Sequence, residues 1–565
     1  MAAPAQAQTT TTVAAYILKR LAQNGVKHLF GVPGATCDGL FSVAAANGVT
    51  PVITASDLEA GYAADGYARL NGLGAVAVTR GVGTLSLAAA IAGAHAERSP
   101  VVLINGGPKA VDIADQAAGG ALYSHSVGKR RKPASGLPSD LNVEVNVFRE
   151  LTCYSARIEK ASEAPGIVDE AITAALTQSR PVYVEIDEGI WGANCKAPAG
   201  RLSKRTDPSG QEAVAAATII NRLTVAAKPA LLIGVEIARY GLAAEAVQLI
   251  ARLNSPYATS LLAKSVLAED TPGFAGVYDG DRSPASVIDV LEKAGFVLAL
   301  GCVFGPHERN FLKTRASRIA NVTEGFAKLP GQPPVQVEIG SLLTSLLAAV
   351  PATYHPAPAR VSRPPIPRRP VASAEPGLTY DQVMDAAGAE LNASMLAVTD
   401  TSLSMYAAST LPVTGTNAFV ANALWQSIGY SPAAALGIGL AGTRRPLVIC
   451  GDGGFQMTAQ SLSSLVRHNV RAIVIVLDNG LYSIEQYLLD KSYFRPPLKT
   501  ARSYLKLNAW NYADLAKAMG VEFARRVATP AELQQALTQA RDAAGPALIH
   551  AIVRPHDLPS ELRPV

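Results

Sequence analysis

The chain reads Gly451-Asp452-Gly453-Gly454-Phe455 and continues through a β-branched run to Asp478-Asn479. Asp452 supplies a carboxylate and Asn479 an amide oxygen, which are ligands that Mg²⁺ takes when a phosphate completes its shell. The glycines let backbone N–H groups approach a diphosphate, and residues 456–468 are predicted to form a helix whose N-terminus favours anions. The apolar run 471–477 is typical of a buried parallel strand. A lone Gly-Asp-Gly signals only a turn, but this spacing indicates a diphosphate and Mg²⁺ site.

Length and composition set the class of protein. The chain has 565 residues, of which 49% are hydrophobic and 17% charged, as in a large α/β protein. This length exceeds what one core can bury and predicts about three domains. A net charge of +5 is modest and does not indicate a nucleic-acid partner. No uninterrupted apolar run reaches about 18 residues, so no transmembrane helix or membrane partner is expected.

The N-terminus and the cysteines indicate in which cellular compartment the protein is expected. Residues 1–12 are rich in Ala and Thr, without the basic and apolar regions of a signal peptide, and predict a disordered start. The cysteines are odd in number, scattered and without metal-binding spacing, which favours a reducing cytoplasm. They are Cys37, Cys153, Cys195, Cys302 and Cys450.

Helix and strand patterns alternate along three segments of the chain. This alternation predicts an α/β fold in which parallel sheets are covered by helices. The predicted domains are residues 1–190, 205–350 and 378–565, and the last contains the diphosphate motif. Residues 351–377 are rich in Pro and Arg, which is typical of a stiff, extended linker.

The first segment contains a second informative region. Residues 57–69 are rich in Ala and Gly and begin a helix beside the end of a strand, where small residues permit close helix–sheet packing. Residues 79–86 form a flexible turn after another strand, at the edge where α/β proteins place ligands. The basic run Lys129–Lys132 is either a solvated loop or a lid or anchoring patch near the site, and the sequence leaves both open.

Taken together, these regions resemble the thiamine diphosphate (ThDP)-dependent 2-oxo acid decarboxylases, the group that includes pyruvate, indolepyruvate and phenylpyruvate decarboxylases. The resemblance covers nearly the whole chain. It rests on residues 30–34, 60–69, 260–266, 425–430 and the diphosphate motif with Tyr482-Ser483-Ile484-Glu485 after it. Acetolactate synthases share the Gly-Asp-Gly run but do not usually have this Tyr-x-x-Glu, so the decarboxylase branch is favoured.

The resemblance implies pyrimidine-binding, central and diphosphate-binding domains. It also implies that ThDP lies between the first domain of one subunit and the third domain of another. A homodimer is then the minimum active unit, and a homotetramer is the expected assembly. Flavin, which some relatives bind in the central domain, is not expected.

The resemblance also implies how ThDP and Mg²⁺ are held. Asp452, Asn479 and the backbone carbonyl of Leu481 would bind Mg²⁺ on the diphosphate. Ile428 would bend the cofactor as an apolar wedge, and Gln426 would offer its backbone carbonyl to the 4′-amino group. The other implied cofactor-binding residues are Thr79, Val82, Asp400, Thr401, Ser402, Gly451, Gly453, Gly454 and Tyr482.

Three further positions are implied to handle protons. Glu485 matches the family's acid for the second half of the reaction, although a solvated helix carboxylate is the simpler interpretation. A carboxyl group beside an apolar cofactor would have a raised pKa, which suits a general acid. His125 follows Ser124 where the family usually has a His-His pair. Ser124 therefore removes one proton relay or substrate contact, which points away from simple pyruvate chemistry.

Asp57 is the sharpest departure from the family pattern. It stands four residues before Gly61, where the family usually has a Glu that bonds the pyrimidine N1′. Asp is shorter by one methylene, roughly 1.5 Å, so the helix lies closer, a water bridges the gap, or cofactor activation is slow. Glu59 would point elsewhere on the helix and should not substitute. Arg80 either lowers the pKa of Asp57 or receives a substrate carboxylate.

These residues predict a ThDP- and Mg²⁺-dependent non-oxidative decarboxylase that converts a 2-oxo acid into CO₂ and an aldehyde. One alternative keeps the cofactor but passes the bound fragment to a second carbonyl, as a carboligase or lyase. A lesser alternative, motivated by Asp57, is a catalytically weak ThDP-binding protein. The side chain of the substrate does not follow from the sequence.

Overall fold

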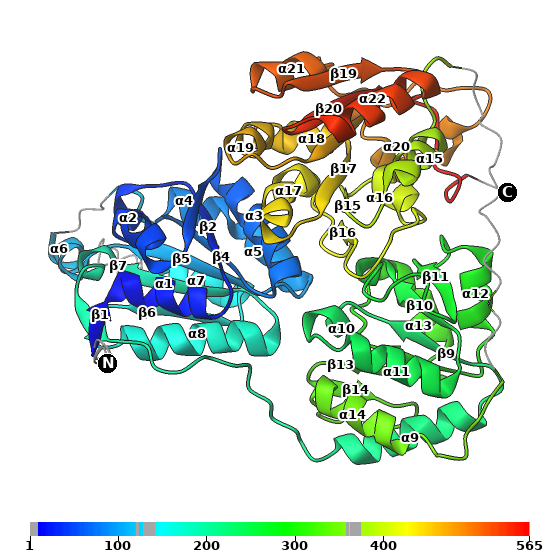
Figure 1. Ribbon diagram of the computed structural model, residues 1–565, viewed down its shortest axis with the longest axis horizontal. Coiled ribbons are helices and arrows are strands. Elements are labelled where there is room, and N and C mark those ends of the chain that lie inside the picture. Colours follow the sequence, from blue (N-terminus) through cyan, green and yellow to red (C-terminus); the bar gives the residue numbers. More distant parts are fainter. Residues whose placement is uncertain (1–8, 120–123, 128–141, 358–360, 362–374, 564–565) are drawn as a thin grey trace, which may run out of the picture. The chain divides into compact units, whose positions relative to one another are not determined.

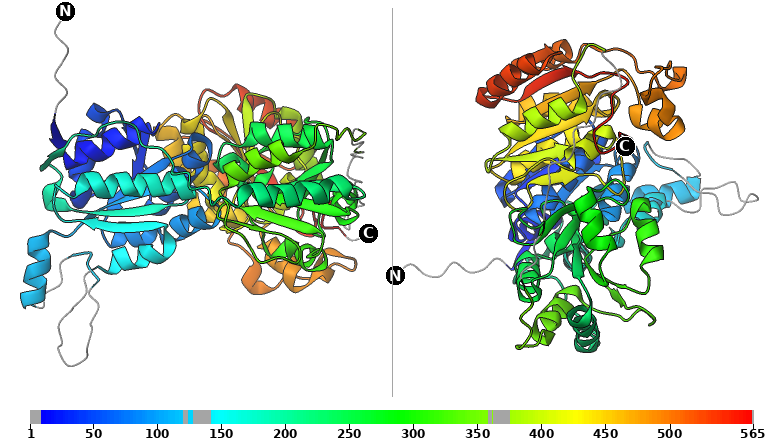
Figure 2. Two further views of the ribbon diagram at one scale, coloured as in Figure 1. Left: turned by 90° about the horizontal axis from the view of Figure 1, so that it is seen from below. Right: turned by 90° about the vertical axis from the view of Figure 1, so that its right-hand side faces the viewer.

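The computed structural model describes residues 9–119, 124–127, 142–357, 361 and 375–563. The predictions for Lys129–Lys132 and for most of the 351–377 linker therefore lie outside the described residues. Contacts group the chain into two compact units, Met1–Arg205 with Leu436–Gly442 and Thr206–Ala435 with Thr443–Val565. Three sheets of six strands each are present, and helices lie on both faces of each (Figure 1 and Figure 2). The predicted α/β fold with parallel sheets is confirmed.

The N-terminal domain is built on a fully parallel sheet. Its strands are, in spatial order, β3 (Thr50–Ile53), β2 (His28–Gly31), β4 (Gly74–Thr79), β5 (Val101–Gly107), β7 (Val182–Asp187) and β6 (Tyr154–Ile158). Its helices are α1 (Val13–Gln23), α2 (Asp38–Ala44), α3 (Asp57–Asn71), α4 (Val82–Ser86), α5 (Ala88–Ala96), α6 (Ala110–Gly119), α7 (Val143–Leu151) and α8 (Ala164–Gln178). Successive side chains of a strand point to opposite faces of the sheet, so alternate strand residues pack into hydrophobic cores on its two sides.

The start of the chain corrects one prediction. Residues 10–12 were expected to be disordered, but they form β1 (Thr10–Thr12), which pairs antiparallel with β8 (Asn194–Lys196). β-branched threonines favour this extended, paired conformation. Thr12 then caps α1, since its side chain accepts a hydrogen bond from Ala15 N.

The central domain has a sheet with one antiparallel edge strand. The strands are β11 (Phe274–Tyr278), β10 (Tyr257–Ser260), β9 (Pro229–Ile233), β12 (Phe296–Leu300), β13 (Ile319–Thr323) and the antiparallel β14 (Phe326–Lys328). Helices α9 (Glu212–Val225), α11 (Ala243–Leu253) and α14 (Ile339–Ala349) pack on one face, and α12 (Ala285–Glu292) and α13 (Arg309–Thr314) on the other. The short α10 (Glu236–Arg239) follows β9.

The C-terminal domain repeats the parallel arrangement. Its strands are β16 (Phe419–Ala421), β15 (Met395–Thr399), β17 (Arg445–Gly451), β18 (Ile473–Asp478), β20 (Ala547–Ile552) and β19 (Phe523–Val527). Its helices are α15 (Tyr380–Glu390), α16 (Leu403–Ala408), α17 (Tyr430–Ala441), α18 (Asp452–Thr458), α19 (Ser461–Arg467), α20 (Ser483–Leu489), α21 (Tyr512–Ala518) and α22 (Pro530–Asp542). None of the described helices combines the length and apolar character needed to cross a membrane.

The observed structure differs in two ways from the single helix predicted over residues 456–468. It begins earlier, because Gly451 is the extended N-cap and Asp452 is already the first residue of α18. It is also interrupted at residues 459–460, where Leu462 N and Ser463 N bond three residues back, to the carbonyls of Ala459 and Gln460. Such tight turns end the regular i to i−4 ladder. The glycine motif is therefore itself the first turn of a helix, directly after a parallel strand.

Candidate active site

The carboxyl ends of β17 and β18 bring the two halves of the diphosphate motif together. Asp452 is 3% exposed. Its Oδ1 accepts a hydrogen bond from Gly453 N at 2.8 Å, and its Oδ2 accepts from Asn479 N at 3.1 Å and Gly480 N at 2.7 Å. Asn479 is held on its other side, since its Nδ2 donates to Tyr380 Oη at 2.9 Å. Asp452 and Asn479 are thus neighbours although 27 positions separate them.

A second carboxylate lies beside this pair. Asp478 Oδ1 accepts from Gly480 N at 3.2 Å, and its Oδ2 lies 2.7 Å from Nε2 of the buried His550. Burial raises the pKa of Asp452, and the nearby charge of Asp478 raises it further. Two carboxylates close together at a buried sheet edge create a negative site that a divalent cation would stabilise.

Two glycines of the motif are needed because of close approaches. A Cβ on Gly454 would lie 2.1 Å from Asp400 Oδ2, and a Cβ on Gly453 would lie 2.5 Å from the Tyr482 ring. In contrast, a Cβ on Gly451 would meet no atom within 4 Å. The first helical turn therefore packs tightly against Asp400 and Tyr482 and is open only at Gly451.

Asp400, at the end of β15, holds the loop that precedes α17. Asp400 is fully buried, and its two oxygens accept hydrogen bonds from Gly429 N at 2.8 Å and Ser431 N at 2.9 Å. The loop is conformationally demanding, with Gln426 at φ 60° and Gly429 at φ 82°. Its Gly429 carbonyl is also bonded by Thr458 Oγ1 at 2.7 Å. Direct contact of Asp400 with a cofactor stays a prediction.

The two hydrogen bonds that Asp400 accepts from this loop predict that cofactor affinity depends on pH. Burial raises the pKa of Asp400 to about 6. Above that pH the carboxylate accepts both N–H bonds, and below it the added proton removes one acceptor. We expect ThDP affinity, measured by titration calorimetry, to be intact above about pH 6 and to fall as pH drops through that value. Asp400→Asn should bind weakly at every pH, and an unchanged acid limb in this variant would contradict the role of Asp400.

The remaining predicted residues of this domain lie around the same loop and strand ends. Gln426 is exposed, Ile428 is half-buried, and Thr401 Oγ1 donates to Asn422 O at 3.1 Å. Ser402 has φ 138° as the residue before α16. Leu481 is buried, and its N–H donates to Asn479 Oδ1 at 3.0 Å. Glu485 is exposed in the first turn of α20, so its carboxylate faces solvent in this chain.

The N-terminal domain places Asp57 at the first position of α3. Ser56 caps the helix by accepting from Glu59 N, and Glu59 Oε2 accepts from Ala55 N at 2.9 Å. Glu59 is thus turned back onto the backbone, as expected, and Asp57 is left as the acid at this edge. Asp57 Oδ1 lies 3.1 Å from where a Cβ on Gly83 would be, and burial raises the pKa of Asp57.

The turn after β4 brings further predicted residues to this edge. Thr79 Oγ1 and Thr36 Oγ1 share a 2.7 Å hydrogen bond, and Val82 is 57% exposed at the start of α4. A Cβ on Gly81 would lie 2.0 Å from His125 O, so the Ser124-His125 turn packs on Gly81. His125 has φ 64°, and both Ser124 and His125 are exposed.

Several supporting residues were missed by sequence reasoning. Glu144 of α7 accepts from Gly81 N at 2.9 Å and fixes the turn, and Tyr380 and His550 support the diphosphate motif. Their only signal in the sequence is polarity inside apolar segments, as for His550 within β20. Such a signal identifies a buried polar residue without naming its partner.

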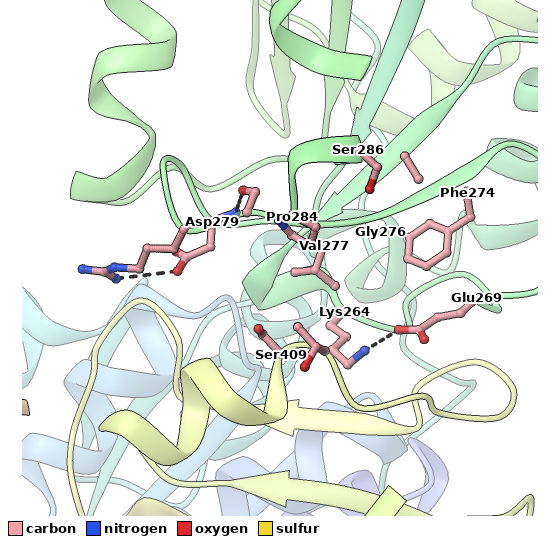
Figure 3. A pocket seen from close by; sticks show the side chains of 13 residues that line it. Lys264, Glu269, Phe274, Gly276, Val277, Asp279, Pro284, Ser286 and Ser409 are labelled. Atoms are coloured by element: carbon pink, nitrogen blue, oxygen red, sulfur yellow. Dashed lines mark hydrogen bonds and ion pairs between the residues drawn. The ribbon is translucent and has the colours of Figure 1, made fainter. Parts of the chain in front are cut away.

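A separate cavity lies in the second unit, next to the end of α16 (Figure 3). It measures ≈ 220 Å³ and is bordered by Lys264, Glu269, Asp279 and Ser409. Lys264 Nζ and Glu269 Oε1 form an ion pair at 2.5 Å. None of the predicted site residues lines this cavity, so it is distinct from the site above.

Comparisons with known proteins identify the family to which the chain belongs. Models described as thiamine pyrophosphate enzyme N-terminal TPP binding, central and C-terminal TPP binding domains match residues 11–125, 216–350 and 401–551. The chain is 31% identical over 542 residues to an alpha-keto-acid decarboxylase of Mycolicibacterium paratuberculosis, covering 94% of this chain and 91% of that protein. The chain belongs to the ThDP-dependent 2-oxo acid decarboxylase family. As a member of this family, it is an enzyme of the carboxy-lyase class.

Further relatives agree with this family. A probable pyruvate decarboxylase of Schizosaccharomyces pombe is 30% identical over 576 residues, which cover 99% of this chain and 96% of that protein. The solved structure of benzoylformate decarboxylase from Polynucleobacter necessarius matches with a TM-score of 0.76 and 18% identity, over 98% of this chain and all of that one. At this low sequence identity, the similarity to the solved structure shows a shared fold.

The site of this family member fits ThDP and Mg²⁺ by its donor set. The Asp452 carboxylate and the Asn479 amide belong to neighbouring residues that share a hydrogen bond, and both side chains carry oxygen atoms. Mg²⁺ usually takes one or two protein oxygens and completes its shell with phosphate and water. Oδ1 of Asp452 accepts one N–H bond and keeps a lone pair for a metal, whereas Oδ2 accepts two. The open space at Gly451 leaves room beside the helix N-terminus for an anionic group.

Proposed function

We propose that the protein catalyses the ThDP- and Mg²⁺-dependent non-oxidative decarboxylation of a 2-oxo acid to an aldehyde. The observation that carries the proposal is the Asp452–Asn479 pair at the N-terminus of α18, within a chain of the decarboxylase family. The bound ThDP would supply a carbon nucleophile and an electron sink. The protein groups would bind it, orient it and move protons.

The residues divide this work between the two units. Asp452, Asn479 and the Leu481 carbonyl would hold Mg²⁺ and the diphosphate. Gln426 and Ile428 lie on the loop that is hydrogen-bonded to Asp400, and they would orient the pyrimidine. Asp57 would hold or move a proton at the pyrimidine ring, and its raised pKa suits a group that exchanges protons. His125 and Glu485, both exposed, would handle protons on the substrate side.

Exposed apolar side chains support assembly of two subunits around each site. In the first unit Val82 and Leu85 of α4 are exposed, and in the second Trp425 and Met457 are 42% and 52% exposed beside the cofactor loop. Exposed apolar residues next to functional residues are typical of an interface. We propose a homodimer as the minimum active unit and a homotetramer as the full assembly, which sedimentation would test. The five cysteines are all unpaired, which supports a cytoplasmic location.

Removal of the metal should abolish cofactor binding. Dialysis against a chelator is expected to eliminate ThDP binding in calorimetry, and added Mg²⁺ should restore it, because the diphosphate charge would otherwise meet Asp452 and Asp478 directly. Asp452→Ala should weaken ThDP binding by at least about 100-fold. Asp514→Ala, at an exposed position of α21, is the matched control and should bind normally. Tight ThDP binding without any divalent cation would contradict this site.

A second candidate is a carboligase, which the Ser124-His125 turn favours. Ser124 offers a hydroxyl where an imidazole is usual, so protonation of the bound fragment has one group fewer. Feeding a 2-oxo acid with and without an acceptor aldehyde separates the two functions. Acyloin formed at the expense of free aldehyde would favour the carboligase.

The decisive experiment for the main proposal is CO₂ release by the purified protein with ThDP and Mg²⁺. The panel should include pyruvate and branched, aryl and dicarboxylic 2-oxo acids. Turnover of one acid, with one aldehyde formed per CO₂, supports the decarboxylase. Failure of every acid while ThDP binds would reject it.

A further inference from the structure

A buried arginine, Arg80, lies beside the predicted site residues of the N-terminal domain. Arg80 directly follows β4, between Thr79 and Val82, and is only 7% exposed. Among the residues that the structure describes, neither its Nε nor its Nη1 has a hydrogen-bond partner. A guanidinium carries a positive charge and five N–H donors, and burying such a group unpaired is strongly unfavourable.

Two buried acids of this domain are engaged with other groups. Glu144 accepts from Gly81 N and from Asn105 Nδ2, and Glu185 pairs with Arg157. Asp57 lies on the same sheet edge, but burial raises its pKa and no influence of Arg80 opposes this. Of the two roles left open by the sequence, the lowering of the Asp57 pKa is therefore not seen. Arg80 is left with a charge that the described protein groups do not compensate.

The turn around Arg80 is rigidly held. Gly81 has φ 66°, its N–H is bonded to Glu144, and its α-carbon packs against the His125 backbone. The strand before it pairs on both sides, with β2 and β5. A guanidinium on such a turn is pre-organised, and its planar fork matches a carboxylate.

We propose that Arg80 binds a second carboxylate of the substrate, so that the preferred substrate is a dicarboxylic 2-oxo acid. This inference rests on the proposed function. In that reaction the C1–C2 bond breaks, CO₂ leaves, and the electron pair left on C2 takes up a proton. A buried cation on the reacting carboxylate would stabilise the ground state and oppose the loss of CO₂. A distal carboxylate keeps its charge throughout, so its binding by Arg80 helps to position the substrate.

The test compares 2-oxoglutarate with its distal methyl ester, which has the same carbon skeleton and one charge less, and with pyruvate. The wild-type kcat/KM should be about 100-fold higher for the diacid than for the ester, because a site built for a polar group rejects the analogue that lacks it. Arg80→Leu should reduce this ratio to about one, and Arg80→Lys should retain part of it. Arg149→Leu, on the exposed face of α7, is the matched control and should keep the ratio.

A thermal readout separates binding from folding. Arg80→Leu removes a buried unpaired charge, so the ligand-free variant should melt higher than wild type, by about 2–4 °C. Added 2-oxoglutarate should raise the melting temperature of the wild-type holoenzyme but not that of Arg80→Leu. Equal use of diacid and ester by wild type, or a ratio that persists in Arg80→Leu, would overturn the inference.

The outcomes distinguish this inference from the proposed function. Turnover of pyruvate or the ester without a preference for the diacid leaves the decarboxylase intact and rejects the role of Arg80. Absence of CO₂ from every acid, with ThDP bound, rejects the decarboxylase itself. The thermal shift with 2-oxoglutarate then still decides whether Arg80 binds a carboxylate.

Discussion

Asp57→Asn is expected to lower 2-oxo acid turnover by about 10²–10⁴-fold, the usual contribution of a positioned acid or base. Asp57 is the acid at the N-terminus of α3 that remains available, because Glu59 is turned back onto Ala55 N. Burial raises the pKa of Asp57 above its ordinary value, which favours proton exchange by this carboxyl group. ThDP binding should persist, since the diphosphate would be held by the C-terminal domain. CO₂ release and calorimetry on the same preparation would check both statements.

Glu59→Gln is the matched control for this change. It alters an acid two residues away that supports the start of α3, so it should affect stability more than turnover. Asp57→Glu restores the longer acid of the family and should raise activity or shift its pH dependence. A large loss in Asp57→Glu would show that the site is built around the shorter side chain and the close approach of Gly83. Full activity of Asp57→Asn would contradict a proton-handling role for Asp57.

Gly454→Ala should be the most damaging single-methyl change in the C-terminal domain motif. The new Cβ would lie 2.1 Å from Asp400 Oδ2, and Asp400 cannot move without breaking its bonds to Gly429 N and Ser431 N. Overpacking of this kind costs about 1–3 kcal/mol or more in the free energy of unfolding. The displaced loop contains Gln426 and Ile428, so ThDP affinity should fall together with stability. Thermal melting without cofactor and ThDP titration would measure the two effects.

Gly451→Ala tests the same motif with the opposite expectation. No atom lies within 4 Å of the new Cβ, and Gly451 has an ordinary φ of −69°. The ligand-free variant should therefore melt within a degree or two of wild type, which corresponds to a change within about 0.5 kcal/mol. Equal loss of stability in both variants would show that the motif needs glycine for backbone freedom rather than for its contact with Asp400.

The parallel strands could be predicted because each carries its own signal. The apolar run before Asp478 becomes β18, and the apolar residues before Thr79 become β4. The helix predicted from residue 456 begins four residues earlier, at Asp452, although glycines usually discourage helix formation. Tertiary contacts of Gly453 and Gly454 outweigh that preference.

The sequence alone determined the fold class, because that depends on local periodicity. It also determined the family and the pairing of Asp452 with Asn479, because their motifs and spacing resemble those of known ThDP enzymes. Tertiary structure decided what Asp400, Glu144 and Arg80 do. Their roles depend on which distant backbone N–H groups or charges lie within hydrogen-bond reach, and chain order does not encode that distance. Burial explains these roles, because a polar group that is removed from water must be paired with another group of the protein or with a ligand.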